Sequence, residues 1–168
     1  MNATTGLTLA GLTAAVIVLI YNLRPWYTGG REMKHLVAFG KGSALGVVSA
    51  VCPGGLLGWA HAHSGAAANA GGSRIAGATT GVRPSAPIAH RALGGLDQNG
   101  ACVVVLIAVL VGLAWKFAGK QDKKRIVGGA FVASVLCLTA GVIGMLTWVP
   151  GALNSVGASA AHAVGVQQ

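Results

Sequence analysis

Histidine is the residue type in this chain whose spacing comes nearest to a metal site. His61 and His63 are separated by a single residue. On a β-strand such a pair shares one face and could ligate a metal, whereas a helix or a loop directs the two rings apart. The surrounding sequence is not typical of a strand. We therefore expect exposed histidines near a membrane interface and no metal at this pair.

The acidic residues are too scattered for paired-carboxylate chemistry. The chain has only Glu32, Asp97 and Asp122, far apart in sequence. General acid–base catalysis and two-metal catalysis both need such groups close together. The sequence also lacks the phosphate-binding, nucleophile-elbow and zinc-protease motifs. We expect a protein that is not an enzyme and that binds no cofactor and no metal.

The three cysteines offer no redox or metal motif. Cys52, Cys102 and Cys137 lie inside apolar runs, and no two of them have a spacing typical of ligands. Their odd number argues against a disulfide framework. We expect them to act as small buried hydrophobic side chains.

Basic residues form the densest cluster of chemistry-bearing side chains. The chain has 12 Lys and Arg against 3 Asp and Glu, a net charge of +9. Basic residues beside apolar segments attract anionic lipid headgroups, so lipid is the favoured partner and nucleic acid the less favoured one. The expected contact residues are Lys116, Lys120, Lys123, Lys124 and Arg125.

Composition places these residues in a membrane protein. Hydrophobic residues make up 54% of the chain and charged residues 9%, and the mean hydropathy is +0.68. So few charges cannot cover the surface of a soluble globule, and so apolar a chain does not stay disordered. We expect a single membrane domain over residues 1–168, in the cell membrane.

Apolar segments predict an all-α integral membrane protein with about four transmembrane helices. The segments are residues 6–23, 42–60, 101–118 and 126–149. We expect the first to be a retained anchor ending at Pro25; a cleaved signal peptide is the alternative, but residues 1–6 carry no basic residue. The segment at 42–60 is weak because Pro53 and two glycines interrupt it, so a re-entrant segment remains the alternative.

The connecting segments differ in composition and predict the orientation. Residues 24–41 and 119–125 are basic, and the second of these joins the last two helices in an antiparallel hairpin. Residues 61–99 are rich in Gly, Ala and Ser, and we expect an irregular external loop. With four spans both basic stretches are cytoplasmic and both termini are not. The uncharged tail, residues 150–168, is either a loose helix on the membrane or disordered.

Small residues recur one turn apart in the apolar segments. Such pairs let membrane helices approach closely, and we expect them to join copies of this chain through the second and fourth segments. No inverted internal repeat is evident. The candidate packing residues are Gly42, Gly46, Gly54, Gly58, Gly129, Ala133, Ala140 and Gly144.

Residues 101–150 resemble the core of conjugative pilins, in which a short Lys-rich loop joins two apolar helices. That resemblance implies a filament whose lumen is lined by the loop, and a leader that is removed, although residues 1–100 are longer and more apolar than a simple leader. The whole chain is similar in composition to the small hydrophobic spread proteins of actinobacterial conjugative plasmids. Phage holins are similar in size and number of spans, but many end in a charged tail.

These features favour a small, non-enzymatic, multi-pass membrane protein. We expect it to act by self-assembly or as a subunit of a membrane complex, in conjugative transfer or secretion. A holin-like pore former and an accessory structural subunit without activity of its own are the alternatives.

Overall fold

A computed structural model describes residues 7–30, 33–82, 87–89 and 95–165 of the chain. These residues are almost entirely helical, so the prediction of an all-α protein is confirmed. A short antiparallel pair joins β1 (Leu7–Thr8) to β2 (Pro87–Ala89). The helices are α1 (Leu9–Thr28), α2 (Met33–Val51), α3 (Gly55–Thr80), α4 (Gln98–Phe117), α5 (Lys120–Leu136), α6 (Ala140–Leu146) and α7 (Val149–Ala163).

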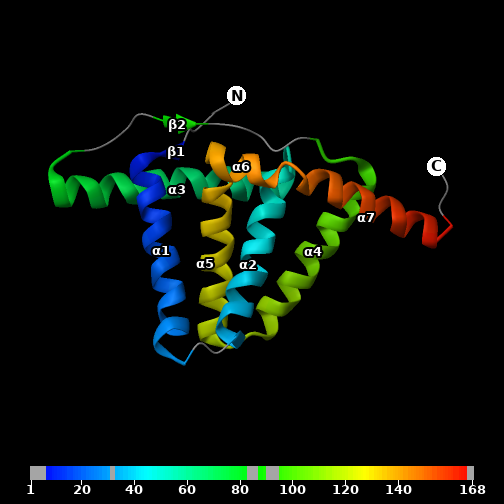
Figure 1. Cartoon of the computed structure of the whole chain (residues 1–168), viewed down its shortest axis with the longest axis horizontal. Helices are drawn as coiled ribbons and strands as arrows, with labels where there is room; N and C mark the ends of the chain where they lie inside the picture. Colours follow the sequence, from blue (N-terminus) through cyan, green and yellow to red (C-terminus); the bar gives the residue numbers. More distant parts are fainter. Residues whose placement is uncertain (1–6, 31–32, 83–86, 90–94, 166–168) are drawn as a thin grey trace.

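The helices form an upright bundle with a layer across one end (Figure 1). Helices α1, α2, α4 and α5 stand side by side, while α3, α6 and α7 lie across the end that carries the N-terminus. The closest packing joins α2 to α5, α1 to α3, and α4 to α7. Helices α3 and α7 extend past the bundle on opposite sides (Figure 1). We call the layered end the crossing end. We call the opposite end, where α5 begins with several basic residues, the basic end.

Two or three of these helices are long and apolar enough to cross a membrane. Helices α1 and α4 meet this condition alone, and α2 meets it only together with α3, from which a bend of 104° separates it. Helix α5 has 17 residues and begins with the polar stretch 120–125, in which four residues are basic, so its apolar part is short. The expected number of four transmembrane helices is therefore not confirmed.

The second apolar segment and the loop after it differ from the prediction. Helix α2 ends at Val51, and the chain turns at Cys52, Pro53 and Gly54, so residues 42–60 are not one helix. The turn follows from Pro53, which cannot donate a backbone hydrogen bond. The irregular loop expected at 61–99 is wrong for residues 61–80, which belong to α3. The many alanines favour a helix there even without apolar periodicity.

The boundaries of the first and last apolar segments also differ from the prediction. Pro25 does not end α1, which continues to Thr28 and closes with a hydrogen bond from the Gly29 nitrogen to the Pro25 carbonyl, 2.9 Å long. The span expected at 126–149 is divided among α5, α6 and the start of α7. Most of the tail belongs to α7, where Pro150 occupies the first turn and needs no backbone donor. The helical alternative is therefore confirmed for residues 150–163.

The chain repeats one plan twice. In each half one helix descends from the crossing end, a second returns, and a third lies across that end: α1, α2, α3 and then α4, α5, α7 (Figure 1). The descending helices also begin alike. The Thr8 side chain accepts a hydrogen bond from the Gly11 nitrogen at 3.1 Å, and the Asp97 side chain accepts one from the Gly100 nitrogen at 2.7 Å.

A crossing helix closes each of these starts in the same way. Asn69 Oδ1 on α3 accepts a hydrogen bond from the nitrogen of Thr8 at 2.8 Å. Asn154 Oδ1 on α7 accepts one from the nitrogen of Asp97 at 3.2 Å. One turn later Gly72 and Gly157 lie against the backbone of the descending helix, where a side chain would not fit. Both halves run in the same direction, so this repeat is parallel and not inverted.

Candidate functional site: the basic end and its groove

The predicted small-residue pairs on α2 and α5 face each other within one chain. A Cβ atom at Gly42 would collide with the carbonyl of Ile126, and one at Gly129 would collide with the carbonyl of Phe39. The contact is therefore reciprocal. Each glycine meets the carbonyl that lies one turn before the glycine of the other helix.

Polar side chains extend this α2–α5 contact. The hydroxyls of Ser49 and Ser134 are hydrogen bonded at 3.1 Å, and both residues are buried. Beside them Gly46 lies against Ala133. These faces are occupied inside the chain, so the interface expected between copies through the second and fourth segments is corrected to an internal contact.

The remaining predicted packing residues make no comparable contact among the described residues. Gly54 lies in the turn after α2 with open space at its Cβ position, and Gly58 lies against the carbonyl of Cys52 in that turn. Gly144 on α6 also faces open space. The side chain of Ala140 lies outside the described part of the structure.

The two histidines lie on α3 and point to different surroundings. The His63 ring stacks on Trp59 with 4.0 Å between ring centres, and its Nδ1 lies 2.9 Å from the Trp59 carbonyl. The Nδ1 of His61 is buried and has no hydrogen-bond partner among the described residues, and burial lowers the pKa of His61. No three His, Cys, Asp or Glu side chains that could hold a metal come together within the described ranges.

The cysteines differ in exposure. Cys137 is buried, as expected, and Cys52 is only half-buried. Cys102 is exposed on α4, so the prediction that it is buried is wrong. It lines a pocket of about 380 Å³ between α4 and α7, together with residues such as Leu106 and Ala160.

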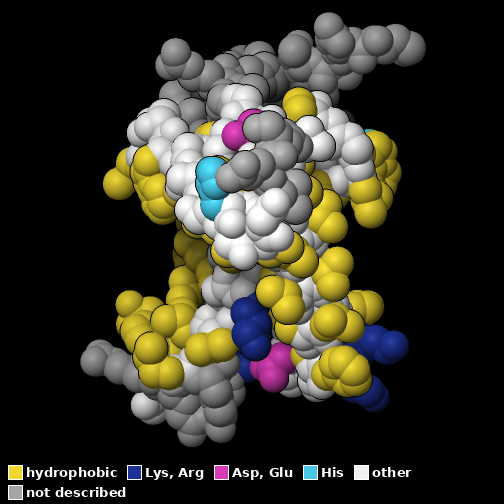
Figure 2. All heavy atoms as spheres, turned by 90° about the vertical axis from the view of Figure 1, so that its right-hand side faces the viewer, with side chains coloured by type: hydrophobic (Ala, Val, Ile, Leu, Met, Phe, Trp, Pro, Cys, Tyr) yellow, Lys and Arg dark blue, Asp and Glu magenta, His cyan; other side chains and the backbone are white. Residues whose placement is uncertain are grey.

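Basic side chains gather at one end of the bundle (Figure 2). The five predicted contact residues lie at the end of α4 and on the first turns of α5, and Arg24 near the end of α1 joins them. The expected loop at 119–125 is a helix from Lys120 onward. These cations crowd a helix N-terminus, where the helix dipole disfavours positive charge and favours an anion.

Two of these cations contact other side chains of the described residues. Arg125 donates a hydrogen bond from Nη1 to Asp122 Oδ1 at 3.2 Å, and its side chain is only 13% exposed. The Lys123 Nζ lies 5.2 Å from the centre of the Trp115 ring, close enough for a cation–π contact. Arg125 is therefore held inward, and Lys123 leans toward α4.

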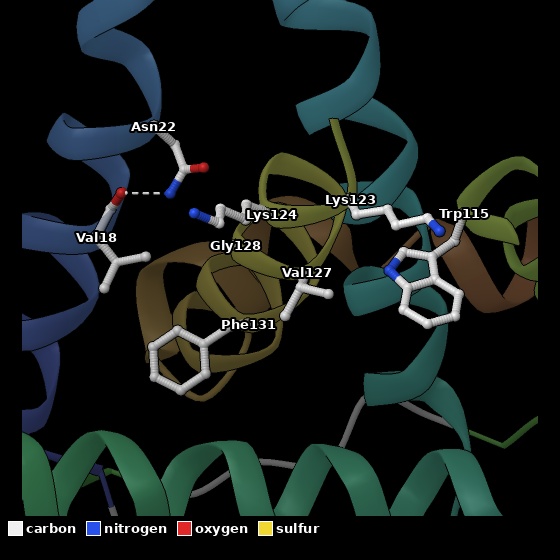
Figure 3. A pocket seen from close by; sticks show the side chains of 8 residues that line it. All are labelled: Val18, Asn22, Trp115, Lys123, Lys124, Val127, Gly128 and Phe131. Carbon is white, nitrogen blue, oxygen red and sulfur yellow. Dashed lines mark hydrogen bonds between the residues drawn. The ribbon is translucent and has the colours of Figure 1, made fainter. Parts of the chain in front are cut away.

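A groove runs along the outer face of α5, between α1 and the end of α4 (Figure 3). Its volume is about 490 Å³. Apolar side chains line most of its length, and the two lysines reach from its floor toward opposite walls (Figure 3). The lining residues are Val18, Asn22, Trp115, Lys123, Lys124, Val127, Gly128 and Phe131.

A smaller pocket continues the groove toward the basic end. Its volume is about 230 Å³, and it shares Asn22 and Lys124 with the groove. Most of the residues that line it carry a polar or basic group, whereas most of those that line the groove are apolar. The lining residues are Tyr21, Asn22, Arg24, Pro25, Gln121, Lys124 and Arg125.

Asn22 and Gly128 explain why α1 and α5 come close at this point. The Nδ2 of Asn22 donates to the Val18 carbonyl of its own helix at 2.8 Å. A Cβ atom at Gly128 would lie 2.6 Å from that same Nδ2, so only glycine leaves room for the amide. Asn22, Arg24 and Phe131 were not among the predicted site residues, because nothing in the spacing of the sequence brings α1 next to α5.

The chain was compared with protein-family models, with curated proteins and with solved structures, and none of them matches it.

Proposed function

We propose that this chain is a multi-pass membrane protein without catalytic activity that acts by assembling with further copies of itself. Conjugative transfer or secretion is the process we propose for the assembly, from the resemblances in composition described above. The basic end lies in the cytoplasm and the crossing end, with both termini, lies on the other side. The distribution of charge supports this orientation, because membrane proteins keep their Lys and Arg on the cytoplasmic side.

The observation that carries the assembly proposal is the outer face of α3. The inner face of this helix buries Gly65, Ala68 and Gly72, while its outer face exposes Ala66, Ala67 and Ala70. Between His63 and Arg74 these three alanines are the exposed residues of α3, and the larger exposed side chains of Trp59 and Ile75 lie outside that stretch. Small side chains suit the close approach of another helix.

The packing of α3 inside the chain supports this interpretation. At Gly72 its inner face approaches the carbonyl of Ala10 so closely that a Cβ atom would collide with it. The same helix thus already uses small residues to bind a neighbouring helix. Because Ala66, Ala67 and Ala70 are exposed, this part of the outer face of α3 is accessible to a second copy.

Native mass spectrometry of the full-length protein, released from detergent micelles, tests the proposal. We expect a defined number of copies. Ala67→Trp combined with Ala70→Trp should convert this species to monomers, because the indole rings keep helices apart. The matched control, Ile20→Trp, changes an exposed residue of α1 and should leave the copy number unchanged.

Two results would overturn the proposal. One is a monomer for the unaltered protein both in mild detergent and in native membrane vesicles. That result would leave an accessory subunit that acts with other chains. The other is an unchanged copy number in the α3 variant, which would exclude this face as the interface.

A further inference from the structure

We propose that the groove along α5 binds one anionic phospholipid, with the phosphate in the small pocket at the basic end and one acyl chain between α1 and Trp115. The inference rests on the membrane placement proposed above but not on self-assembly. The occupant is a lipid because the basic pocket and the apolar groove are continuous through Asn22 and Lys124.

The small pocket, which would hold the headgroup, is lined by basic side chains that are available to bind an anion. Of the three that line the small pocket, Arg125 is held by Asp122. Arg24 and Lys124 have no ion pair with any described residue, and they come from different helices. Tyr21 and Gln121 line the same pocket and can donate hydrogen bonds to phosphate oxygens.

The local field also favours an anion at this place. The small pocket lies beside the first turns of α5, where the helix dipole contributes partial positive charge. Four basic residues in the first turns of α5 add to that positive field, and Asp122 is the only acidic residue in the same turns. A phosphate with net negative charge relieves this repulsion, whereas a zwitterionic lipid brings a cation of its own.

The groove has the surface that an acyl chain needs. Val18, Val127 and Phe131 line it on the side away from the basic end, and Trp115 forms the far wall (Figure 3). Val127 is 57% exposed although it is apolar, so part of the floor is uncovered within the chain. Gly128 keeps the floor low where α1 and α5 approach. A free phosphate would use the small pocket only and leave this surface open.

Native mass spectrometry also provides the test. The full-length protein in a non-ionic detergent is titrated with phosphatidylglycerol, and in parallel with phosphatidylcholine or inorganic phosphate. We expect one phosphatidylglycerol molecule to be retained per chain and phosphatidylcholine to be retained weakly. Arg24→Gln combined with Lys124→Gln should weaken phosphatidylglycerol binding by about tenfold or more, given the attraction of each cation for an anionic lipid surface.

Two further variants test separate contributions to lipid binding. One distinguishes the specific site from the net charge of the basic end, and the other distinguishes the acyl chain from the headgroup. Lys116→Gln combined with Lys120→Gln removes the same charge from residues that line neither the groove nor the pocket, and should change binding by less than about twofold. Val127→Trp fills the groove while keeping every cation, and should also abolish retention of the lipid. Circular dichroism of each variant checks that the helices are intact.

Other outcomes reject the lipid. Equal retention of the two phospholipids would mean that binding does not depend on the charge of the headgroup. Equal loss of binding in both charge-pair variants would mean that only the general charge of the basic end matters. Undiminished binding to the Val127→Trp variant, with competition by inorganic phosphate, would identify a phosphate site without a chain. A preference for an oligonucleotide over phosphatidylglycerol would point to nucleic acid.

Failure of this proposal can be told apart from failure of the proposed function. A monomer that retains phosphatidylglycerol keeps the groove and rejects assembly. A defined oligomer that retains none does the opposite. A chain that alkaline carbonate releases from membranes would reject the membrane placement on which both proposals depend.

Discussion

At the contact between α2 and α5, single glycine hydrogens face backbone carbonyls. Gly42 and Gly129 have no room for even one further carbon atom, because the carbonyl of the opposing helix occupies the place of a Cβ. Gly40, on the same helix as Gly42, faces open space. The same change at two nearby glycines therefore has opposite consequences.

We predict that Gly42→Ala lowers and Gly40→Ala raises thermal stability. Alanine is a better helix former than glycine by about 1 kcal/mol, which is the gain expected at Gly40. At Gly42 the extra methyl group forces the helices apart, at a cost of about 1–3 kcal/mol. Loss of helical circular dichroism on heating in detergent measures both. Equal shifts of the same sign would contradict the contact.

Sequence alone indicates which glycines are able to pack but not what they meet. Gly42-xxx-Gly46 and Gly129-xxx-Ala133 were predicted as packing faces, and the structure brings them together inside one chain. The similar pair Gly54 and Gly58 is separated by the turn that Pro53 causes, so it forms no such face. In a chain with 27 glycines, spacing cannot tell these cases apart.

The elements are joined by hydrogen bonds between descending and crossing helices. Thr8 is buried, and both its nitrogen and its hydroxyl donate to Asn69 Oδ1, at 2.8 and 2.9 Å. Asp97 makes a single such bond to Asn154 and is exposed. The first junction therefore depends more strongly on its asparagine.

We predict that Asn69→Ala loosens the start of α1 and costs about 1–2 kcal/mol, typical of a lost cap and an unpaired buried donor. Asn154→Ala, the matched change in the second half, should have a smaller effect. Amide hydrogen exchange is the measurement: it should accelerate in the first turn of α1 in the Asn69→Ala variant and stay unchanged at the start of α4. Acceleration at both starts would mean a general loss of structure instead.

Predictions at the scale of elements depended on how strongly a segment is apolar. Helix α4 lies close to the predicted 101–118 because its run of large aliphatic residues has no interruption. Helix α3 was missed because alanine and glycine carry no apolar periodicity. The groove was out of reach of sequence, since it joins α1 to α5 across more than half of the chain. Of the residues that line the groove, the sequence predicted a contact role only for Lys123 and Lys124.

The whole molecule has one basic end and one crossing end. Helices α1 and α4 connect the two ends and are long and apolar enough to cross a membrane. Lysine and arginine side chains gather at the basic end (Figure 2). The crossing end has exposed residues such as Ser159 on α7, and the basic end has Lys120. These two residues can report on opposite sides of a membrane.

We predict opposite labelling of Ser159→Cys and Lys120→Cys in intact cells. Both are introduced into a chain whose own cysteines are replaced by alanine, and a membrane-impermeant maleimide is added outside. Cys at position 159 should react at once, because the crossing end is non-cytoplasmic in the proposed orientation. Cys at position 120 should react only after the membrane is opened. The reverse pattern would invert the orientation, and equal labelling would contradict a membrane-spanning bundle.

The reciprocal contact between the two halves has the geometry of a two-fold dimer interface, in which one surface meets its own equivalent. Here a covalent connection joins the two protomer-like halves. Between two separate chains, such association would depend on protein concentration. Within one chain it is intramolecular, and the connection between the halves sets a high effective concentration. The short contact between α2 and α5 at Gly42 and Gly129 is then enough to hold the halves together, however few copies of the protein a membrane contains.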